Sequence, residues 1–243
     1  MYSFDSRVRY SEVGADGKMS LCSVIHYMQD CSIFQSEDLG VGIAVLKQEK
    51  KAWLLSSWQI EIGRRPRLGE RLTVGTWASG FKAMYGYRNF ILRDESGDDA
   101  VRAASIWIYM NLETGRPEKV DDFVAEIYRP EPALEMEKAG RKIAVPDGLR
   151  EYPAFPVQKY QIDTNGHVNN GQYLQMAEAW LPEDEQVEKL RVEYRKAAVY
   201  GDMIVPAAGL DESGASVVAL KGLDGGVFAV IQAKTKQDHH EAE

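Results

Sequence analysis

The chain has 243 residues, of which 44% are hydrophobic and 27% are charged, the balance of a soluble globular protein. This length suits one large domain or two of about 120 residues, and either size can bury a substantial core. A net charge of −8 argues against nucleic-acid binding, and no apolar run approaches the roughly 20 residues of a membrane span.

The N-terminal residues and the cysteines indicate a cytoplasmic protein. The start, MYSFDSRVRY, contains Asp5 and has no apolar signal core. Cys22 and Cys31 offer neither a disulfide framework nor a metal-ligand spacing, and buried small hydrophobic residues are the favoured interpretation of both. We therefore expect no metal and no organic cofactor.

In the first half, the hydrophobic pattern predicts a helix followed by antiparallel strands. Residues 7–19 suggest a short strand and a glycine-containing turn, and a helix follows with Ser20 as its N-cap. Runs rich in Trp, Ile, Val, Tyr and Thr then predict strands. The helix is expected at about 20–36, and the strands at 53–62, 71–81, 84–94 and 100–111.

Prolines concentrated in 129–156 predict a linker between two domains. The domains are expected at 1–130 and 155–243, with a linker at 131–154 that includes a short helix at 133–142. The second half predicts a helix at 170–181, ended by Leu181-Pro182, and a solvated tail carrying His239 and His240. Its strands are expected at 155–162, 190–198, 203–210, 216–223 and 227–236.

The two halves resemble each other, which favours two copies of one helix-plus-sheet unit. In the first match, Gly17 aligns with Gly166, and both turns lead directly into a helix. In the second, residues 59–70 align with 191–202, so that Glu70 corresponds to Asp202. The first copy carries Gly14, Asp16 and Lys18 where the second carries Asp163, Asn165 and His167.

The stretch 160–182, YQIDTNGHVNNGQYLQMAEAWLP, carries the candidate catalytic residues. Asp163, Asn165 and His167 alternate through a tight turn that leads into a helix. A histidine that can act as an acid or a base, two side chains that can hold a water molecule, and backbone amides at a helix start are the groups that acyl-transfer hydrolysis requires. We therefore predict catalysis here, with those amides binding the oxyanion.

Each of these residues also has a purely structural interpretation. His167 can be a turn histidine bonded to the backbone, Asp163 an Asx-turn residue, and Asn165 a left-handed turn residue beside Gly166. For Asn169 and Asn170, capping of the helix is the commoner role and substrate binding the alternative.

A cluster of arginines is the densest positive patch in this acidic chain. Arg64, Arg65 and Arg67 lie within four residues, and such a patch would attract an acidic protein partner. The alternative interpretation is a solvated hairpin turn.

Several motifs together resemble the acyl-acyl carrier protein thioesterase family. They are DTNGHVNNGQYL at 163–174, VEYRK at 192–196, RYSEVGADGKM at 9–19, the Pro-x-x-Gly turn at 66–69, and Thr76-Trp77. The resemblance implies an α+β protein of two tandem hot-dog domains, each an antiparallel sheet wrapped around a central helix. The N-terminal domain would bind the acyl chain and the carrier, and the C-terminal domain would be catalytic.

The resemblance also implies a function. The expected reaction is hydrolysis of fatty acyl-carrier-protein thioesters to free fatty acid, which terminates fatty acid synthesis. Asp163, Asn165 and His167 match the family's catalytic residues. The partners would be acyl carrier protein and the acyl chain, with neither nucleic acid nor membrane, and the resemblance allows a homodimer.

One position departs from the family. Many relatives place Glu and then Cys after the Glu-Tyr-Arg run, whereas this chain has Ala197 and Ala198. Asp163 or His167 must then activate water. Three alternatives stay open: an acyl-CoA thioesterase using the same site, an inactive acyl-thioester binding or sensing protein, and a hot-dog dehydratase.

Overall fold

The computed structural model describes residues 1–137, 139–181 and 187–236, so Pro182, His239 and His240 lie outside the described residues. The chain divides into two compact units, 1–142 and 143–243. No helix within the described ranges is both long enough and apolar enough to cross a membrane.

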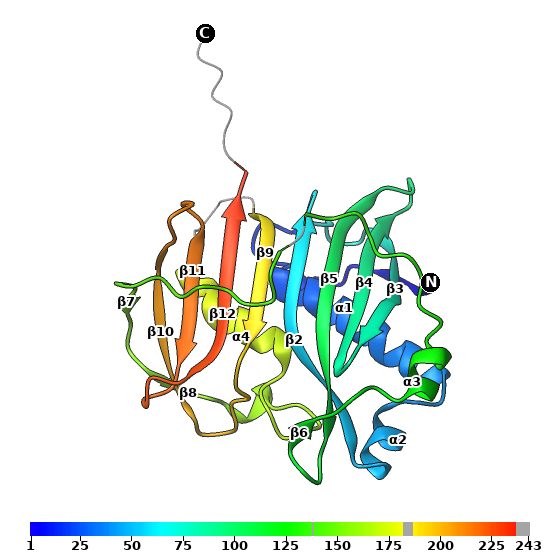
Figure 1. Ribbon diagram of the computed structural model, residues 1–243. Helices are drawn as coiled ribbons and strands as arrows, with labels where there is room; N and C mark the ends of the chain where they lie inside the picture. The colour runs from blue at the N-terminus through cyan, green and yellow to red at the C-terminus, as the bar shows by residue number, and fades with distance from the viewer. Residues whose placement is uncertain (138, 182–186, 237–243) are drawn as a thin grey trace. The chain divides into compact units, whose positions relative to one another are not determined.

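The first unit is an antiparallel sheet with one long helix. Its strands lie in the order β1-β3-β4-β5-β2, and β6 pairs with β5. In Figure 1, α1 crosses one face of these strands. The elements are β1 (Tyr2–Arg7), η1 (Tyr10–Glu12), α1 (Leu21–Asp38), α2 (Ile43–Gln48), β2 (Lys51–Ile62), β3 (Arg71–Lys82), β4 (Tyr85–Asp94), β5 (Asp99–Asn111), β6 (Arg116–Pro117) and α3 (Asp122–Ile127).

Helix α1 begins where the sequence predicts. The Ser20 side chain accepts a hydrogen bond from the Ser23 amide, which satisfies one of the free N–H groups of the first turn. The buried face of the helix includes Ile25 and Met28, both fully buried. Burial of this face provides the hydrophobic driving force that holds the helix against the sheet.

The second unit has the same architecture with shorter elements. Its strands lie in the order β9-β12-β11-β10-β7, β8 pairs with β10, and α4 lies against β11 and β12 (Figure 1). The elements are β7 (Arg150–Glu151), β8 (Phe155–Pro156), η2 (Lys159–Gln161), α4 (Asn170–Ala177), η3 (Glu178–Trp180), β9 (Val187–Tyr194), β10 (Met203–Leu210), β11 (Ser216–Lys221) and β12 (Val227–Thr235).

Matching hydrogen bonds confirm the predicted repeat. The amide of Val8 donates to Glu70 O at 2.9 Å, and the amide of Val157 donates to Asp202 O at 2.8 Å. The strand register matches as well, because Arg7 lies opposite Arg71 as Pro156 lies opposite Met203. Position n of the first turn and helix start thus corresponds to n + 149 in the second. Position n of the 66–70 loop corresponds to n + 132.

Several predicted elements were wrong or displaced. The short strand predicted within 7–19 is replaced by η1 and the isolated Val13–Met19 bridge, and the strand predicted at 190–198 is β9, which ends at Tyr194. The strand predicted at 155–162 is the two-residue β8 followed by the 3-10 helix η2, and no helix forms in the described part of 133–142. The helix predicted at 170–181 ends its α-helical part at Ala177 and continues as the 3-10 helix η3. Strand β1 and the short helices α2 and α3 were not predicted, because they are too short to show a clear period.

The segment predicted as a linker is extended and bonded to both units in turn. The amide of Glu131 donates to Ala78 O at 2.9 Å, and the Trp77 indole donates to Pro132 O at 2.9 Å. Further along, the amide of Ile143 donates to Glu193 Oε2 at 2.8 Å. The predicted domain limits of 130 and 155 stay a prediction.

Candidate functional site

The candidate residues lie in one tight turn between η2 and α4. Ile162 and Val168 form an antiparallel bridge across it, and the amide of Asp163 donates to His167 O at 2.7 Å. Gly166 has a φ of 78°, in the left-handed region that a residue without Cβ adopts without strain. The turn therefore brings Asp163 and His167 opposite each other at its base.

Asp163 stabilises this turn, as its structural interpretation predicts. Its Oδ1 accepts hydrogen bonds from the amides of Asn165, at 2.8 Å, and His167, at 3.3 Å. Its Oδ2 has no hydrogen-bond partner in the described part of the chain. The same carboxylate can therefore fold the turn with one oxygen and present the other to a ligand.

The side chains of His167 and Asn165 are uncommitted. His167 is half-buried and Asn165 is exposed. Neither side chain makes a hydrogen bond to any other described residue. The structural alternative for His167, a ring bonded to the backbone, is therefore not observed, and both ring nitrogens are available for proton transfer.

The start of α4 is capped by Asn169. Its Oδ1 accepts from the Gly171 amide at 3.0 Å, and its backbone carbonyl accepts from the Gln172 amide at 2.9 Å. The amides of Val168 and Asn169 donate to Ala198 O and Gln161 O. These four amides are already bonded, so they are not free to bind an oxyanion as the sequence suggested. The Asn165 side chain keeps an amide donor that is bonded to no other described residue.

The VEYRK motif holds the turn from the other side. The Tyr194 hydroxyl donates to Asn170 O at 3.0 Å, and the Ala198 amide donates to the Tyr173 hydroxyl at 2.8 Å. Burial raises the pKa of Tyr173 to about 12, so its hydroxyl stays protonated at neutral pH. Ala198 also accepts from the Val168 amide at 2.9 Å, which places Ala197 and Ala198 directly beside the candidate turn.

The carboxylate of this motif serves the structure. Glu193 is buried, and its Oε2 accepts from the Ile143 amide at 2.8 Å and from Arg195 at 2.9 Å. A buried carboxylate bonded in this way is held in place and neutralised by its partner. Glu193 therefore does not substitute for the carboxylate that relatives carry after the motif.

The predicted arginine patch is largely paired with acids. Arg64 donates to Glu70 at 2.6 Å and to Asp94 at 2.5 Å, and Arg65 pairs with Asp16. Burial alone would raise the pKa of Glu70, but the Arg64 guanidinium lowers it overall. Arg67 is exposed and forms no ion pair with another described residue. Its side chain is the one that a partner would meet as an unneutralised charge.

Two further observations concern nucleophiles and unpartnered atoms. Both cysteines are buried, and burial raises the pKa of the Cys31 thiol to about 12, which makes it a poor nucleophile. Gln172, three residues beyond the N-cap, has a buried Oε1 without a hydrogen-bond partner among the described residues. Sequence reasoning missed Gln172, because only packing leaves this oxygen unpaired. The described residues include no group of three His, Cys, Asp or Glu that could hold a metal ion.

The duplicated unit, with a helix against an antiparallel sheet and an uncommitted histidine at one helix start, is a tandem hot-dog architecture. The family description "Acyl-ACP thioesterase N-terminal domain" matches residues 1–128, and "Acyl-ACP thioesterase C-terminal domain" matches residues 148–223. The chain belongs to the acyl-ACP thioesterase family.

Relatives and solved structures agree with this assignment. A chloroplastic acyl-acyl-carrier-protein hydrolase of Cuphea viscosissima is 26% identical over 226 residues, covering 85% of this chain and 54% of the relative. An oleoyl-acyl carrier protein thioesterase of Coriandrum sativum is 24% identical, covering 93% and 68%. The chain thus spans about half the length of several curated relatives it matches.

An acyl-ACP thioesterase of Bacteroides thetaiotaomicron has the same fold, with a TM-score of 0.88 at 22% identity, covering 96% of this chain and 97% of that one. The 12:0-ACP thioesterase of Umbellularia californica gives 0.81 at 19% identity, covering 96% and 97%. These likenesses confirm the predicted fold class.

Proposed function

We propose that this protein hydrolyses fatty acyl thioesters carried by acyl carrier protein, releasing free fatty acid and the carrier thiol in fatty acid biosynthesis. Family membership supports the reaction class. The observation that carries the proposal is the His167 ring, which has no bonding partner among the described residues and belongs to a turn whose amides are held by Asp163 Oδ1.

The proposed reaction uses the uncommitted groups of the turn. His167 accepts a proton from water as its oxygen attacks the thioester carbonyl carbon, and the Asn165 amide donates to the carbonyl oxygen as charge develops there. The C–S bond then breaks, and the His167 imidazolium returns the proton to the thiolate sulfur. Asp163 keeps the turn closed through Oδ1, and the negative charge of its carboxylate stabilises the imidazolium.

The two domains have different roles in the proposed function. Catalysis belongs to residues 155–243, and binding of the acyl chain and the carrier belongs to residues 1–130, with Arg67 as the exposed contact. Asn169 caps the helix through Oδ1, so its Nδ2 donor can contact the substrate without breaking the bond to Gly171. A cytoplasmic location and a homodimer remain predictions that accompany this function.

Two alternatives have a specific observation in their favour. Pairing of Arg64 and Arg65 with acids weakens the expected carrier patch, which favours an acyl-CoA thioesterase. The alanines at 197 and 198, beside the turn, favour an inactive protein that binds acyl thioesters.

The test is incubation of the purified protein with matched acyl-carrier-protein and acyl-CoA thioesters, with detection of released thiol. We expect release from the carrier substrates at the higher kcat/KM. Equal turnover of both sets would assign a CoA thioesterase. Binding without thiol release would assign a binding protein, and loss of water from a β-hydroxyacyl substrate would assign a dehydratase.

A further inference from the structure

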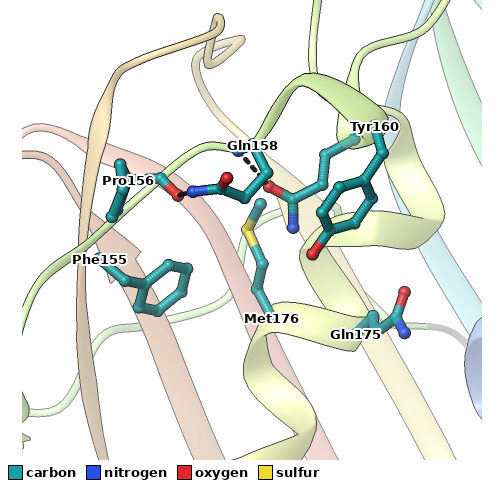
Figure 2. A pocket seen from close by; sticks show the side chains of 7 residues that line it. Phe155, Pro156, Gln158, Tyr160, Gln175 and Met176 are labelled. Atoms are coloured by element: carbon teal, nitrogen blue, oxygen red, sulfur yellow. Dashed lines mark hydrogen bonds between the residues drawn. The ribbon is translucent and has the colours of Figure 1, made fainter.

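A hollow of about 320 Å³ opens on the second unit, next to the candidate turn. Figure 2 shows Phe155 and Pro156 on one side, Tyr160 and Gln175 on the other, and Met176 between them. Gln158 and Gln161 complete the lining. The lining contains three amide side chains, two aromatic rings and a thioether, but no charged side chain, and His167 is not part of it.

In the first unit a tyrosine fills the corresponding place. Tyr27 and Met176 are each the seventh residue after a helix N-cap, Ser20 in one unit and Asn169 in the other. Tyr27 is only 5% exposed, and its ring stacks against Phe4 with 6.5 Å between ring centroids. The second unit thus has the shorter methionine where the first has a buried phenol.

The contacts of the Tyr27 hydroxyl identify the matching walls. It donates to Glu12 Oε2 at 2.7 Å, lies 3.3 Å from Arg7 O, and accepts from Ser6 Oγ at 3.2 Å. The n + 149 correspondence relates Ser6, Arg7 and Glu12 to Phe155, Pro156 and Gln161. All three of these line the hollow. The hollow is therefore a site that the first unit fills with its own side chain and the second unit leaves open.

One lining group has an unused donor. Gln161 is only 7% exposed, and its Oε1 accepts from the Gln158 amide at 2.7 Å. Its Nε2 has no hydrogen-bond partner among the residues that the structure describes. An amide donor without a protein partner in the lining of an open hollow suits a ligand that brings a carbonyl acceptor.

We infer that the hollow binds the distal part of the pantetheine arm of the thioester substrate, an inference that rests on the proposed function. This part of the arm is neutral, with a secondary amide, a hydroxyl-bearing carbon and a geminal dimethyl carbon in succession. Its carbonyl would accept from Gln161 Nε2, and its methyl groups would contact Met176 and Phe155.

The position of the hollow fits this assignment. The carbonyl of Gln161 accepts from the Asn169 amide at 2.9 Å, and the next residue, Ile162, bridges to Val168 beside His167. An arm held against Gln161 would therefore lead toward the candidate turn. A rigid site for the arm orients the thioester before chemistry begins.

The test fills the hollow as the first unit does, with Met176→Tyr. Two acyl thioesters with the same acyl group are compared, one of pantetheine and one of N-acetylcysteamine, which lacks the distal amide and the geminal dimethyl group. We expect KM for the pantetheine thioester to rise about tenfold with kcat unchanged, and KM for the short thioester to stay constant. The control Lys159→Tyr adds the same ring at an exposed residue of η2 outside the lining and should change neither value.

A direct measurement keeps the inference testable if the variant does not fold or if no thioester is hydrolysed. Free pantetheine is titrated into wild-type protein with labelled methionine methyl groups, and the Met176 signal should shift while N-acetylcysteamine leaves it in place. An unshifted Met176 signal at saturating pantetheine would overturn the inference, as would equal KM changes for both thioesters. Binding of p-cresol in place of pantetheine would also overturn it and assign a small aromatic ligand. Absence of hydrolysis with a shifted Met176 signal would count against the proposed function alone.

Discussion

The turns before α1 and before α4 have the same backbone and different side-chain commitments. Both have a bridge across the base, a glycine of positive φ at the tip, and a capped helix behind them. In the first, Asp16 pairs with Arg65, and Gly17 O accepts from the Leu68 amide at 3.0 Å. In the second, His167 and Asn165 have side chains without partners in the described ranges. The same turn backbone therefore carries side chains that stabilise the first unit and side chains that are available for chemistry in the second unit.

A second difference between the units shows how the backbone beside the turn is kept the same although the residues differ. The first unit has Pro66 and Val24 where the second has Ala198 and Tyr173. Proline has no N–H, so the first unit needs no acceptor there, whereas the Ala198 N–H is satisfied by the Tyr173 hydroxyl. The change of one partner is matched by a change of the other, because a buried unpaired N–H would be costly.

The largest expected effect is a loss of activity on substitution in the second turn but not in the first. His167→Ala should lower kcat by at least about 10²-fold, the scale of a lost acid–base group. The matched control is Lys18→Ala, at the corresponding position of the first turn, which should leave kcat unchanged. Thiol release measures both, and a melting curve checks folding. Full turnover in a folded His167→Ala protein would mean that the active site lies elsewhere.

The hydrogen bond from the Ala198 amide to the Tyr173 hydroxyl can be removed by one substitution, and a second substitution can compensate for its loss. Tyr173→Phe leaves the buried Ala198 N–H without an acceptor and should cost about 1–3 kcal/mol in the free energy of unfolding. Adding Ala198→Pro removes the donor, as in the first unit, and should recover most of that loss. Denaturant unfolding of the single and double variants measures the difference; an equally unstable double variant would contradict the pairing.

The same substitution changes the pH dependence of stability. The pKa of Tyr173 is about 12 in the folded protein against 10.0 ordinarily, because burial disfavours the phenolate. Its contribution to stability is complete below pH 10 and is lost as the pH rises to 12, because the unfolded state ionises first. The wild type should therefore lose more stability than Tyr173→Phe across this range in unfolding measurements.

The two functions of Asp163 can be separated. Asp163→Asn keeps an oxygen that accepts from the Asn165 and His167 amides, so the melting temperature should change little. The loss of charge beside His167 should lower kcat about tenfold. Asp163→Ala should lower both kcat and the melting temperature. An unchanged kcat in Asp163→Asn would mean that Asp163 only stabilises the turn and takes no part in catalysis.

Position 197 tests whether the second turn lacks a carboxylate. Ala197 is exposed and lies beside the turn, so Ala197→Glu can be accommodated. If water activation limits turnover, the added carboxylate should raise kcat about fivefold. Ala197→Gln is the neutral control of equal size. A rise in both variants would point to packing and not to charge.

The smallest expected effect concerns the carrier. Arg67→Glu should raise KM for acyl-carrier-protein thioesters about threefold and leave KM for acyl-CoA unchanged, because an acidic carrier would be repelled. Arg65→Gln, which removes a charge already paired with Asp16, should change KM less. Raised salt should reduce the Arg67 effect; an effect independent of salt would argue against charge steering.

Sequence reasoning located the candidate turn because its information is local. Alternating polar residues, a glycine at the tip and an asparagine cap all act within a few residues, and the structure has each of them in place. The sequence did not predict features that depend on contacts between residues far apart in the chain. The sequence predicts a positive patch at Arg64, Arg65 and Arg67 or a solvated hairpin turn, but it does not show that Asp94, 30 residues away from Arg64, pairs with that arginine.

The sequence by itself determined the duplicated unit, its long strands and the turn with Asp163, Asn165 and His167, because hydrophobic period and turn chemistry are written in neighbouring residues. Only the tertiary structure decided which groups keep no hydrogen-bond partner among the described residues: the amides of Val168, Asn169, Gly171 and Gln172 are bonded, the His167 ring is not, and Gln161, which lines the open hollow, keeps one donor. The physical reason is that a hydrogen bond or an ion pair depends on distance in space, and folding sets that distance between residues far apart in the chain.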